Sequence, residues 1–167
     1  ANDIVYKRAK QSNKSDSVGI SVVAVVIWET SLFWISVGDC RLYCLRQGEL
    51  VQLTSDQTIS RYLRLQVLKD GTDADAKNRF DDKDALTNYL GMKSLKKPDG
   101  NILPFSLEAE NRLLLCSNGL YSQLDLSEIA RTLESEGQRA ANKLVDSSLS
   151  KSRKNKEHVA AVVISCS

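Results

Sequence analysis

The chain has 167 residues, of which 42% are hydrophobic and 26% are charged, and its formal net charge is +2 at pH 7. This length suits one compact domain with its own hydrophobic core, so the sequence predicts a single domain over residues 1–167. The small net charge gives no reason to expect nucleic acid or an anionic membrane as a partner.

The longest apolar run covers residues 18–27, which is about half of the roughly twenty residues that a membrane-spanning helix needs. Its β-branched side chains favour a strand instead. The first eight residues lack the charged and then apolar layout of a signal peptide. We therefore expect a cytoplasmic protein that does not interact with a membrane.

The strands of the first half are expected at residues 20–27, 32–37, 41–46 and 49–53, after a polar stretch with at most a short helical start. The two residues Gln47 and Gly48 form the turn of the second hairpin, and the four strands together read as one meander. Near-continuous apolarity of the first two strands predicts burial on both of their faces.

A helix follows, with an N-cap expected among residues 54–56, apolar positions at helical spacing, and an end at Asp70-Gly71. The acidic stretch 72–84 leaves two interpretations open, a solvated loop or short helix and a cation-binding cluster. Residues 93–100 contain Pro98 and Gly100 and predict an exposed turn.

The second half predicts a strand at 112–116, a sharp turn at 117–120, helices at 126–133 and 138–149, and a last strand at 159–164. Asp125 and Glu128 form a capping box at the start of the first of these helices. The basic run 151–156 is either a solvated loop or a phosphate contact. This order of strands and helices favours an α+β fold in which helices cover sheets.

The cysteines form no CxxC pair, and three of the four lie inside apolar runs, which favours buried free thiols over a metal site or disulfides. If Cys40 and Cys44 share one strand, they are about 13 Å apart, beyond the roughly 7 Å that a disulfide allows. The four residues concerned are Cys40, Cys44, Cys116 and Cys166.

Several of these segments together resemble the metal-dependent protein phosphatases of the PP2C (PPM) family. Residues 38–41 are similar to the family pattern GDSR, residues 113–120 to LLLCSDGL, and residues 157–164 to DN followed by a β-rich run. Weaker similarities, in the same order along the chain as in the family, occur at 18–21, 53–58 and 86–91.

The resemblance implies a sandwich of two antiparallel β-sheets flanked by helices, with the family's N-terminal strands missing or truncated. It also implies a centre of two manganese or magnesium ions, where a water molecule attacks the phosphorus of phosphoserine or phosphothreonine. Carboxylate oxygens suit these metals because they are hard anionic ligands that lower the pKa of bound water.

The departures from the family pattern bear on activity. The chain contains no DGHGG motif and no match to the family's phosphate-binding arginine; Cys40 replaces the GDSR serine and Gln57 replaces a histidine. Asn118 replaces a metal-binding aspartate, and Glu157 matches the last aspartate, with His158 beside it.

We therefore expect no catalytic residue in this chain. Asn118 and Glu157 are assigned as degenerate metal positions, and Gly38, Asp39 and Arg41 as a structural motif. Other interpretations stay open: Asn118 also suits a left-handed turn, and His158 also suits a surface position.

The first functional hypothesis is a catalytically inactive PP2C-like domain, a pseudophosphatase that needs no cofactor and regulates a protein partner such as a phosphoprotein or a kinase. The alternative is a weakly active Ser/Thr phosphatase that uses Mn²⁺ or Mg²⁺ and needs an upstream segment or partner. A third hypothesis is that open sheet edges pair with another chain, which would give a homo-oligomer or a hetero-complex.

Overall fold

The computed structural model of the chain describes residues 1–12, 18–70, 84–135, 137–151 and 158–167. The acidic stretch 72–84 therefore lies outside the described residues except for Asp84, and the basic run 151–156 lies outside them except for Lys151. The chain divides into two compact units. The first comprises Ala1–Val22, Val37–Asp39 and Asp56–Pro98, and the second comprises Val23–Ser36, Cys40–Ser55 and Asp99–Ser167. The expectation of one domain over residues 1–167 stays a prediction.

The described part of the first unit includes the helices α1 (Asn2–Gln11) and α2 (Ile59–Asp70). Isolated antiparallel bridges join Ile20 to Leu90 and Thr58 to Leu86. The N-cap expected at 54–56 is wrong, because α2 begins only at Ile59, where the hydroxyl of Thr58 accepts a hydrogen bond from the amide of Arg61 at 3.4 Å.

The first sheet of the second unit has the strand order β1-β2-β5, with β6 also pairing with β2. Its strands are β1 (Val22–Trp28), β2 (Ser31–Val37), β5 (Asp99–Gly100) and β6 (Phe105–Ser106). Burial of β1 and β2 on both faces was a wrong prediction. Val26 and Trp28 of β1 and Ile35 of β2 are 65%, 71% and 52% exposed.

The second sheet has the order β4-β3-β7-β8 and is antiparallel throughout. Its strands are β3 (Arg41–Arg46), β4 (Glu49–Gln52), β7 (Arg112–Cys116) and β8 (Ala161–Ser165). Gln47 and Gly48 both have positive φ, as the predicted two-residue turn between β3 and β4 requires. Because β2 and β3 belong to different sheets, the predicted four-strand meander is wrong.

Three helices follow β7, namely α3 (Asn118–Tyr121), α4 (Leu126–Leu133) and α5 (Gly137–Lys151). The carboxylate of Asp125 accepts a hydrogen bond from the amide of Glu128 at 2.8 Å, so the predicted N-cap of α4 is confirmed. The predicted sharp turn at 117–120 is instead the single helical turn α3.

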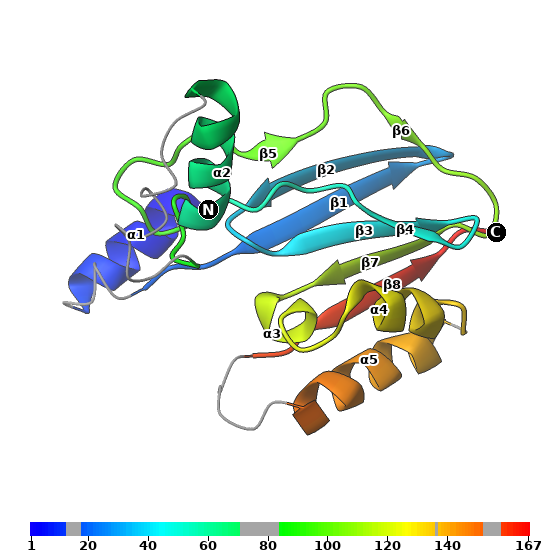
Figure 1. Cartoon of the computed structure of the whole chain (residues 1–167). Helices are drawn as coiled ribbons and strands as arrows, with labels where there is room; N and C mark the ends of the chain where they lie inside the picture. The colour runs from blue at the N-terminus through cyan, green and yellow to red at the C-terminus, as the bar shows by residue number, and fades with distance from the viewer. Residues whose placement is uncertain (13–17, 71–83, 136, 152–157) are drawn as a thin grey trace. The chain divides into compact units, whose positions relative to one another are not determined.

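The second unit is a layered structure with two hydrophobic cores (Figure 1). One core lies between the two sheets and includes Leu32, Leu42 and Leu113. The other lies between the second sheet and its helices and includes Tyr43 and Leu144. The alternation of side chains along β3 explains the arrangement, because Leu42 and Tyr43 point to opposite faces. The predicted α+β sandwich of antiparallel sheets with helices is therefore confirmed.

All four cysteines are free thiols, as predicted. Cys44 and Cys116 are buried, but Cys40 and Cys166 are only partly buried, so the expectation of burial holds for two of the four. Burial raises the pKa of the Cys44 and Cys166 thiols, against the opposing effects of Arg46 and Arg112, respectively.

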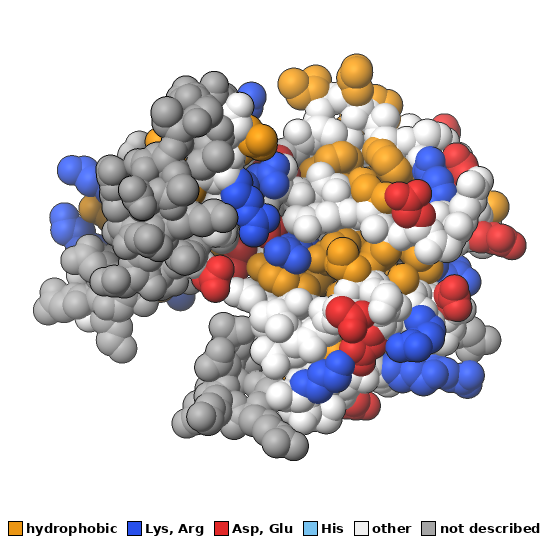
Figure 2. All heavy atoms as spheres, viewed as in Figure 1, with side chains coloured by type: hydrophobic (Ala, Val, Ile, Leu, Met, Phe, Trp, Pro, Cys, Tyr) orange, Lys and Arg blue, Asp and Glu red, His pale blue; other side chains and the backbone are white. Residues whose placement is uncertain are grey.

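The surface also carries exposed hydrophobic side chains. Ile102 and Leu103, in the loop between β5 and β6, are 90% and 80% exposed, and Figure 2 shows hydrophobic side chains along this loop. No helix among the described ranges is long and apolar enough to cross a bilayer.

Candidate functional site

The turn at Gly38-Asp39, in the first unit, is fixed by hydrogen bonds to its backbone. Gly38 has a φ of +97°, which glycine adopts without strain. Its amide donates to Oε1 of Gln57 at 2.9 Å, and its carbonyl accepts from the Gln57 amide at 2.9 Å. The amide of Asp39 donates to Oγ of Ser21 at 3.3 Å. Asp39, a residue that is only 8% exposed, therefore follows a glycine whose backbone amide and carbonyl are both hydrogen-bonded.

Gln57 connects this turn to residues much later in the chain. Its Oε1 also accepts from Nδ2 of Asn88 at 3.0 Å, and its Nε2 donates to the carbonyl of Lys97 at 3.1 Å. Asn88 is 1% exposed, and its Oδ1 in turn accepts from the Lys96 amide at 3.0 Å. A neutral amide side chain can donate and accept at once, so the glutamine works here as a structural connector.

Arg41 opens β3 and pairs with Cys116, the last residue of β7. Its Nη1 donates to the hydroxyl of Tyr43 at 2.8 Å. Its guanidinium carbon lies 3.5 Å from the ring centroid of Tyr121 in α3, a cation–π geometry. These contacts join the start of β3 to the helical turn that follows β7.

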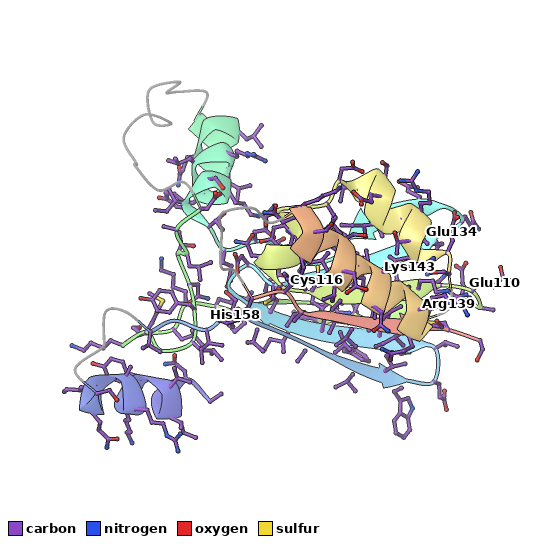
Figure 3. The ribbon with its side chains drawn as sticks, turned by 90° about the horizontal axis from the view of Figure 1, so that it is seen from below. Glu110, Cys116, Glu134, Arg139, Lys143 and His158 are labelled. Carbon is purple, nitrogen blue, oxygen red and sulfur yellow. The ribbon has the colours of Figure 1, made fainter. Side chains whose placement is uncertain are left out.

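Asn118 is the first residue of α3 and is partly buried. The interpretation that it stands in a left-handed turn is wrong, because Asn118 is helical and is not among the positive-φ residues. Its neighbour Ser117 donates from Oγ to the carbonyl of His158 at 2.9 Å and accepts from the Ala160 amide at 3.0 Å. Figure 3 shows His158 and Cys116 at the end of the sheet toward which α5 runs.

The predicted site residues thus fall into three groups. Arg41 and Asn118 lie at the same end of the second sheet, because Arg41 is opposite Cys116 and Asn118 follows Cys116 by two residues. Gly38 and Asp39 belong to the other unit. Glu157 lies outside the described residues, while His158 is exposed, as a surface residue would be.

Three residues that contact other residues discussed above were missed as functional candidates: Asn88 in the first unit, and Tyr121 and Ser148 in the second. The helical periodicity of 138–149 gave a signal for Ser148, since it placed this serine on the apolar face. Asn88 lies within the family-like segment 86–91, but no local pattern indicated its contact with Gln57. Nothing in the sequence indicated Tyr121, because its partner Arg41 is distant along the chain.

The described residues do not by themselves fit a two-metal centre. Within the described ranges, no group of three or more histidine, cysteine, aspartate or glutamate side chains is arranged to hold a metal ion. Asn118 offers a neutral amide oxygen, which attracts Mg²⁺ or Mn²⁺ less than a carboxylate does. A two-metal centre would therefore need ligands besides the residues in the described ranges.

The sequence profile of the family described as protein phosphatase 2C matches residues 1–157. The chain belongs to the protein phosphatase 2C family. It is 28% identical over 137 residues to the serine/threonine phosphatase stp of Listeria monocytogenes, an overlap of 81% of this chain and 52% of the relative. The chain thus spans about half the length of the curated relatives it matches.

Solved structures agree on the PP2C fold. The Streptococcus agalactiae serine/threonine phosphatase superposes with a TM-score of 0.80 at 23% identity, over 98% of this chain and 66% of that one. The catalytic domain of the phosphatase PstP, crystallised with two manganese ions, superposes with a TM-score of 0.72 at 22% identity, over 97% of this chain and 65% of that one. At sequence identities this low, the structural similarity shows a shared fold and nothing further.

Proposed function

We propose that this chain forms part of a weakly active metal-dependent phosphatase that removes phosphate from phosphoserine or phosphothreonine in proteins. The observation that carries the proposal is family membership along most of the chain, together with a curated relative named as a serine/threonine phosphatase. The alternative stated from the sequence thus has more support than catalytic silence.

The hydrogen bonds around Asn118, just after the end of β7, also support the proposal. Ser117 and Gly119, on either side of Asn118, are each hydrogen-bonded to other elements of the second unit. An aspartate has the same shape as asparagine and would gain a negative charge at a position already fixed. The proposal therefore attributes the weak activity to the missing charge at this position.

To bind a metal ion, the protein needs carboxylate ligands in addition to Asn118. Glu157 is the first candidate in the sequence, and the remaining carboxylates would be supplied by an upstream segment or a partner. Because one anionic ligand is replaced by a neutral one, we expect weak metal binding that requires millimolar Mn²⁺.

The test is phosphate release from a phosphothreonine peptide by the full-length protein, after chelation and dialysis, across a titration of MnCl₂. Asn118→Asp restores the charge at constant shape, and Asn118→Leu removes the oxygen at similar volume. We expect slow Mn²⁺-dependent release by the unmodified protein, about tenfold or greater acceleration in Asn118→Asp, and none in Asn118→Leu.

The proposal fails if neither the unmodified protein nor Asn118→Asp releases phosphate at any Mn²⁺ concentration while both show the same folded circular dichroism spectrum. It also fails if release occurs equally in Asn118→Leu, because the activity would then come from a contaminant or another site.

A second candidate function, favoured by the neutral Asn118, is a pseudophosphatase that binds a phosphoprotein without hydrolysing it. Fluorescence anisotropy with the same peptide in phosphorylated and unphosphorylated forms separates the two. Selective binding of the phosphorylated peptide without phosphate release supports the second candidate. Equal affinity for the two peptides would rule it out.

A further inference from the structure

Three lysines lie close together on one exposed segment of the first unit. The side chains of Lys93, Lys96 and Lys97 are all exposed, and none of their ammonium groups forms an ion pair with a carboxylate of the described residues. The sequence from residue 85 to residue 98 contains no aspartate or glutamate. The positive charge of this segment is therefore not neutralised locally, and it attracts anionic groups from solution.

The backbone that carries these lysines is fixed by side chains from earlier in the chain. Asn88, which is 1% exposed, accepts a hydrogen bond from the Lys96 amide at 3.0 Å and donates one to the Lys96 carbonyl at 3.4 Å. Nε2 of Gln57 donates to the Lys97 carbonyl at 3.1 Å. Because this backbone is already ordered, a partner that binds here does not have to order a free loop.

Gln57 also joins the lysine segment to one of the predicted site segments. Its Oε1 accepts from the Gly38 amide at 2.9 Å, while its Nε2 donates to the Lys97 carbonyl. One side-chain amide therefore separates the Lys97 backbone from the turn that precedes Asp39, and all of these residues belong to the first unit. A peptide bound along the three lysines would lie within a few residues of this turn.

The choice of lysine indicates the kind of partner. An arginine binds one phosphate or carboxylate with two parallel N–H donors, whereas the ammonium of lysine is a point charge on a flexible stem. Three such charges within residues 93–97 suit the spaced carboxylates of an extended acidic peptide. The cations of α5 suit it less, because Asp146 lies one helical turn after Lys143.

We propose that residues 93–97 form a docking surface for acidic residues that flank the phosphorylated residue of a substrate. This inference rests on the proposed function, because it names the class of phosphoprotein that the phosphatase selects. The lysines act through surface charge, so they raise the affinity for the substrate and leave the chemical step unchanged.

The test uses the full-length protein and three phosphothreonine peptides that differ only in their flanking residues, which are glutamates, glutamines or lysines. Lys96→Gln/Lys97→Gln is compared with Arg139→Gln/Lys143→Gln, which removes the same charge from exposed positions of α5. Because all four side chains are exposed, both double variants should fold. Fluorescence anisotropy gives the affinity for each peptide, and phosphate release with MnCl₂ gives KM and kcat.

We expect the unmodified protein to bind the glutamate-flanked peptide about threefold to tenfold more tightly than the glutamine-flanked one, the scale of two or three exposed charge pairs. This preference should be largely lost in Lys96→Gln/Lys97→Gln and kept in the α5 variant. It should also vanish at about 1 M NaCl, where the screening length is about 3 Å. In Lys96→Gln/Lys97→Gln, KM for the glutamate-flanked peptide should rise while kcat stays unchanged.

Equal loss of the preference in the two double variants would overturn the inference, because net charge rather than this segment would then be responsible. It is also overturned if the glutamate-flanked and glutamine-flanked peptides bind the unmodified protein equally, or if an oligothymidylate of the same charge binds more tightly than the acidic peptide.

Failure of the proposed function gives a separate result, in which no peptide releases phosphate at any Mn²⁺ concentration. The anisotropy measurement then decides alone. A preference for the acidic peptide that depends on Lys96 and Lys97 supports the docking surface, and its absence refutes it.

Discussion

The side-chain oxygen of Gln57 accepts a hydrogen bond from the backbone amide of Gly38 at 2.9 Å, while the backbone amide of Gln57 returns one to the Gly38 carbonyl at 2.9 Å. One residue thus satisfies both backbone groups of a glycine that is almost twenty positions earlier. Gln57 thus makes the two hydrogen bonds that a neighbouring strand would otherwise make to the residue before Asp39.

Gln57→Ala should therefore destabilise the protein. The substitution leaves the Gly38 amide without its side-chain acceptor, and an unsatisfied buried donor costs about 1–3 kcal/mol. It also removes the shorter of the two hydrogen bonds that Nδ2 of Asn88 donates. Urea unfolding measures the loss. Gln138→Ala is the control, because it removes only an exposed contact with Asn142 within α5; an equal loss in both variants would contradict the connector role of Gln57.

Gly38→Ala should be more harmful than Gly48→Ala, although both glycines have positive φ. Left-handed backbone costs a residue with a Cβ about 1–2 kcal/mol in either place. At Gly38 the new Cβ would also clash with Oγ of Ser21, whereas at Gly48 nothing lies within 4 Å of it. Overpacking adds about 1–3 kcal/mol at Gly38 only. Equal unfolding midpoints in the two variants would refute the clash with Ser21.

Arg41→Lys should lose stability even though the charge is kept. A lysine cannot both lie flat over Tyr121 and donate to Tyr43 as the guanidinium does. The expected loss is about 1–2 kcal/mol, the scale of a partly desolvated cation–π contact. Arg139→Lys is the matched control, because Arg139 is exposed on α5. If the two variants unfold at the same urea concentration, charge alone explains the role of Arg41.

Asp125 should make stability depend on pH in the acid range. Hydrogen bonds from the Ser127 hydroxyl and from the Glu128 amide hold the pKa of this carboxylate below its ordinary value. A lowered folded-state pKa means that the stabilisation is fully present above the unfolded value of about 3.9 and is lost as the pH falls through the lower folded value.

Asp125→Asn keeps a capping oxygen but does not titrate, so it is the appropriate comparison. The difference in unfolding free energy between the two proteins should be constant at neutral pH and should shrink below about pH 4. A difference that stays constant down to about pH 2 would show that the cap does not depend on ionisation.

Local signals in the sequence predicted the elements whose shape depends on neighbouring residues. The turn at Gln47-Gly48, the strand at 112–116 and the cap at Asp125 agree with the structure because each is determined within a few positions. The predicted N-cap of α2 at 54–56 was wrong because the hydroxyl of Thr54 instead accepts a hydrogen bond from the amide of Leu42. The spacing of a capping residue in the sequence does not show whether its side chain is hydrogen-bonded to a strand instead.

The sequence predicted which residues belong to the candidate site, but not the contacts between them. The resemblance indicated Gly38, Asp39, Arg41, Asn118 and Glu157, but the contacts of Arg41 with Tyr121 and of Ser148 with Gly119 depend on how distant elements pack. Glu157 remains a prediction, because it lies outside the described residues.

The pairing of β3 with β7 also constrains how the second unit forms. Its register joins Cys44 to Leu113, and β8 then adds to the far side of β7. Sheets built from such distant pairs fold slowly, in milliseconds to seconds, because a long loop must close before its contacts stabilise it. During synthesis the hairpin of β3 and β4 emerges well before β7, so the apolar side chains of Tyr43 and Leu45 remain uncovered over that interval. Newly made chains should therefore depend on chaperones until β7, α4 and α5 have been translated.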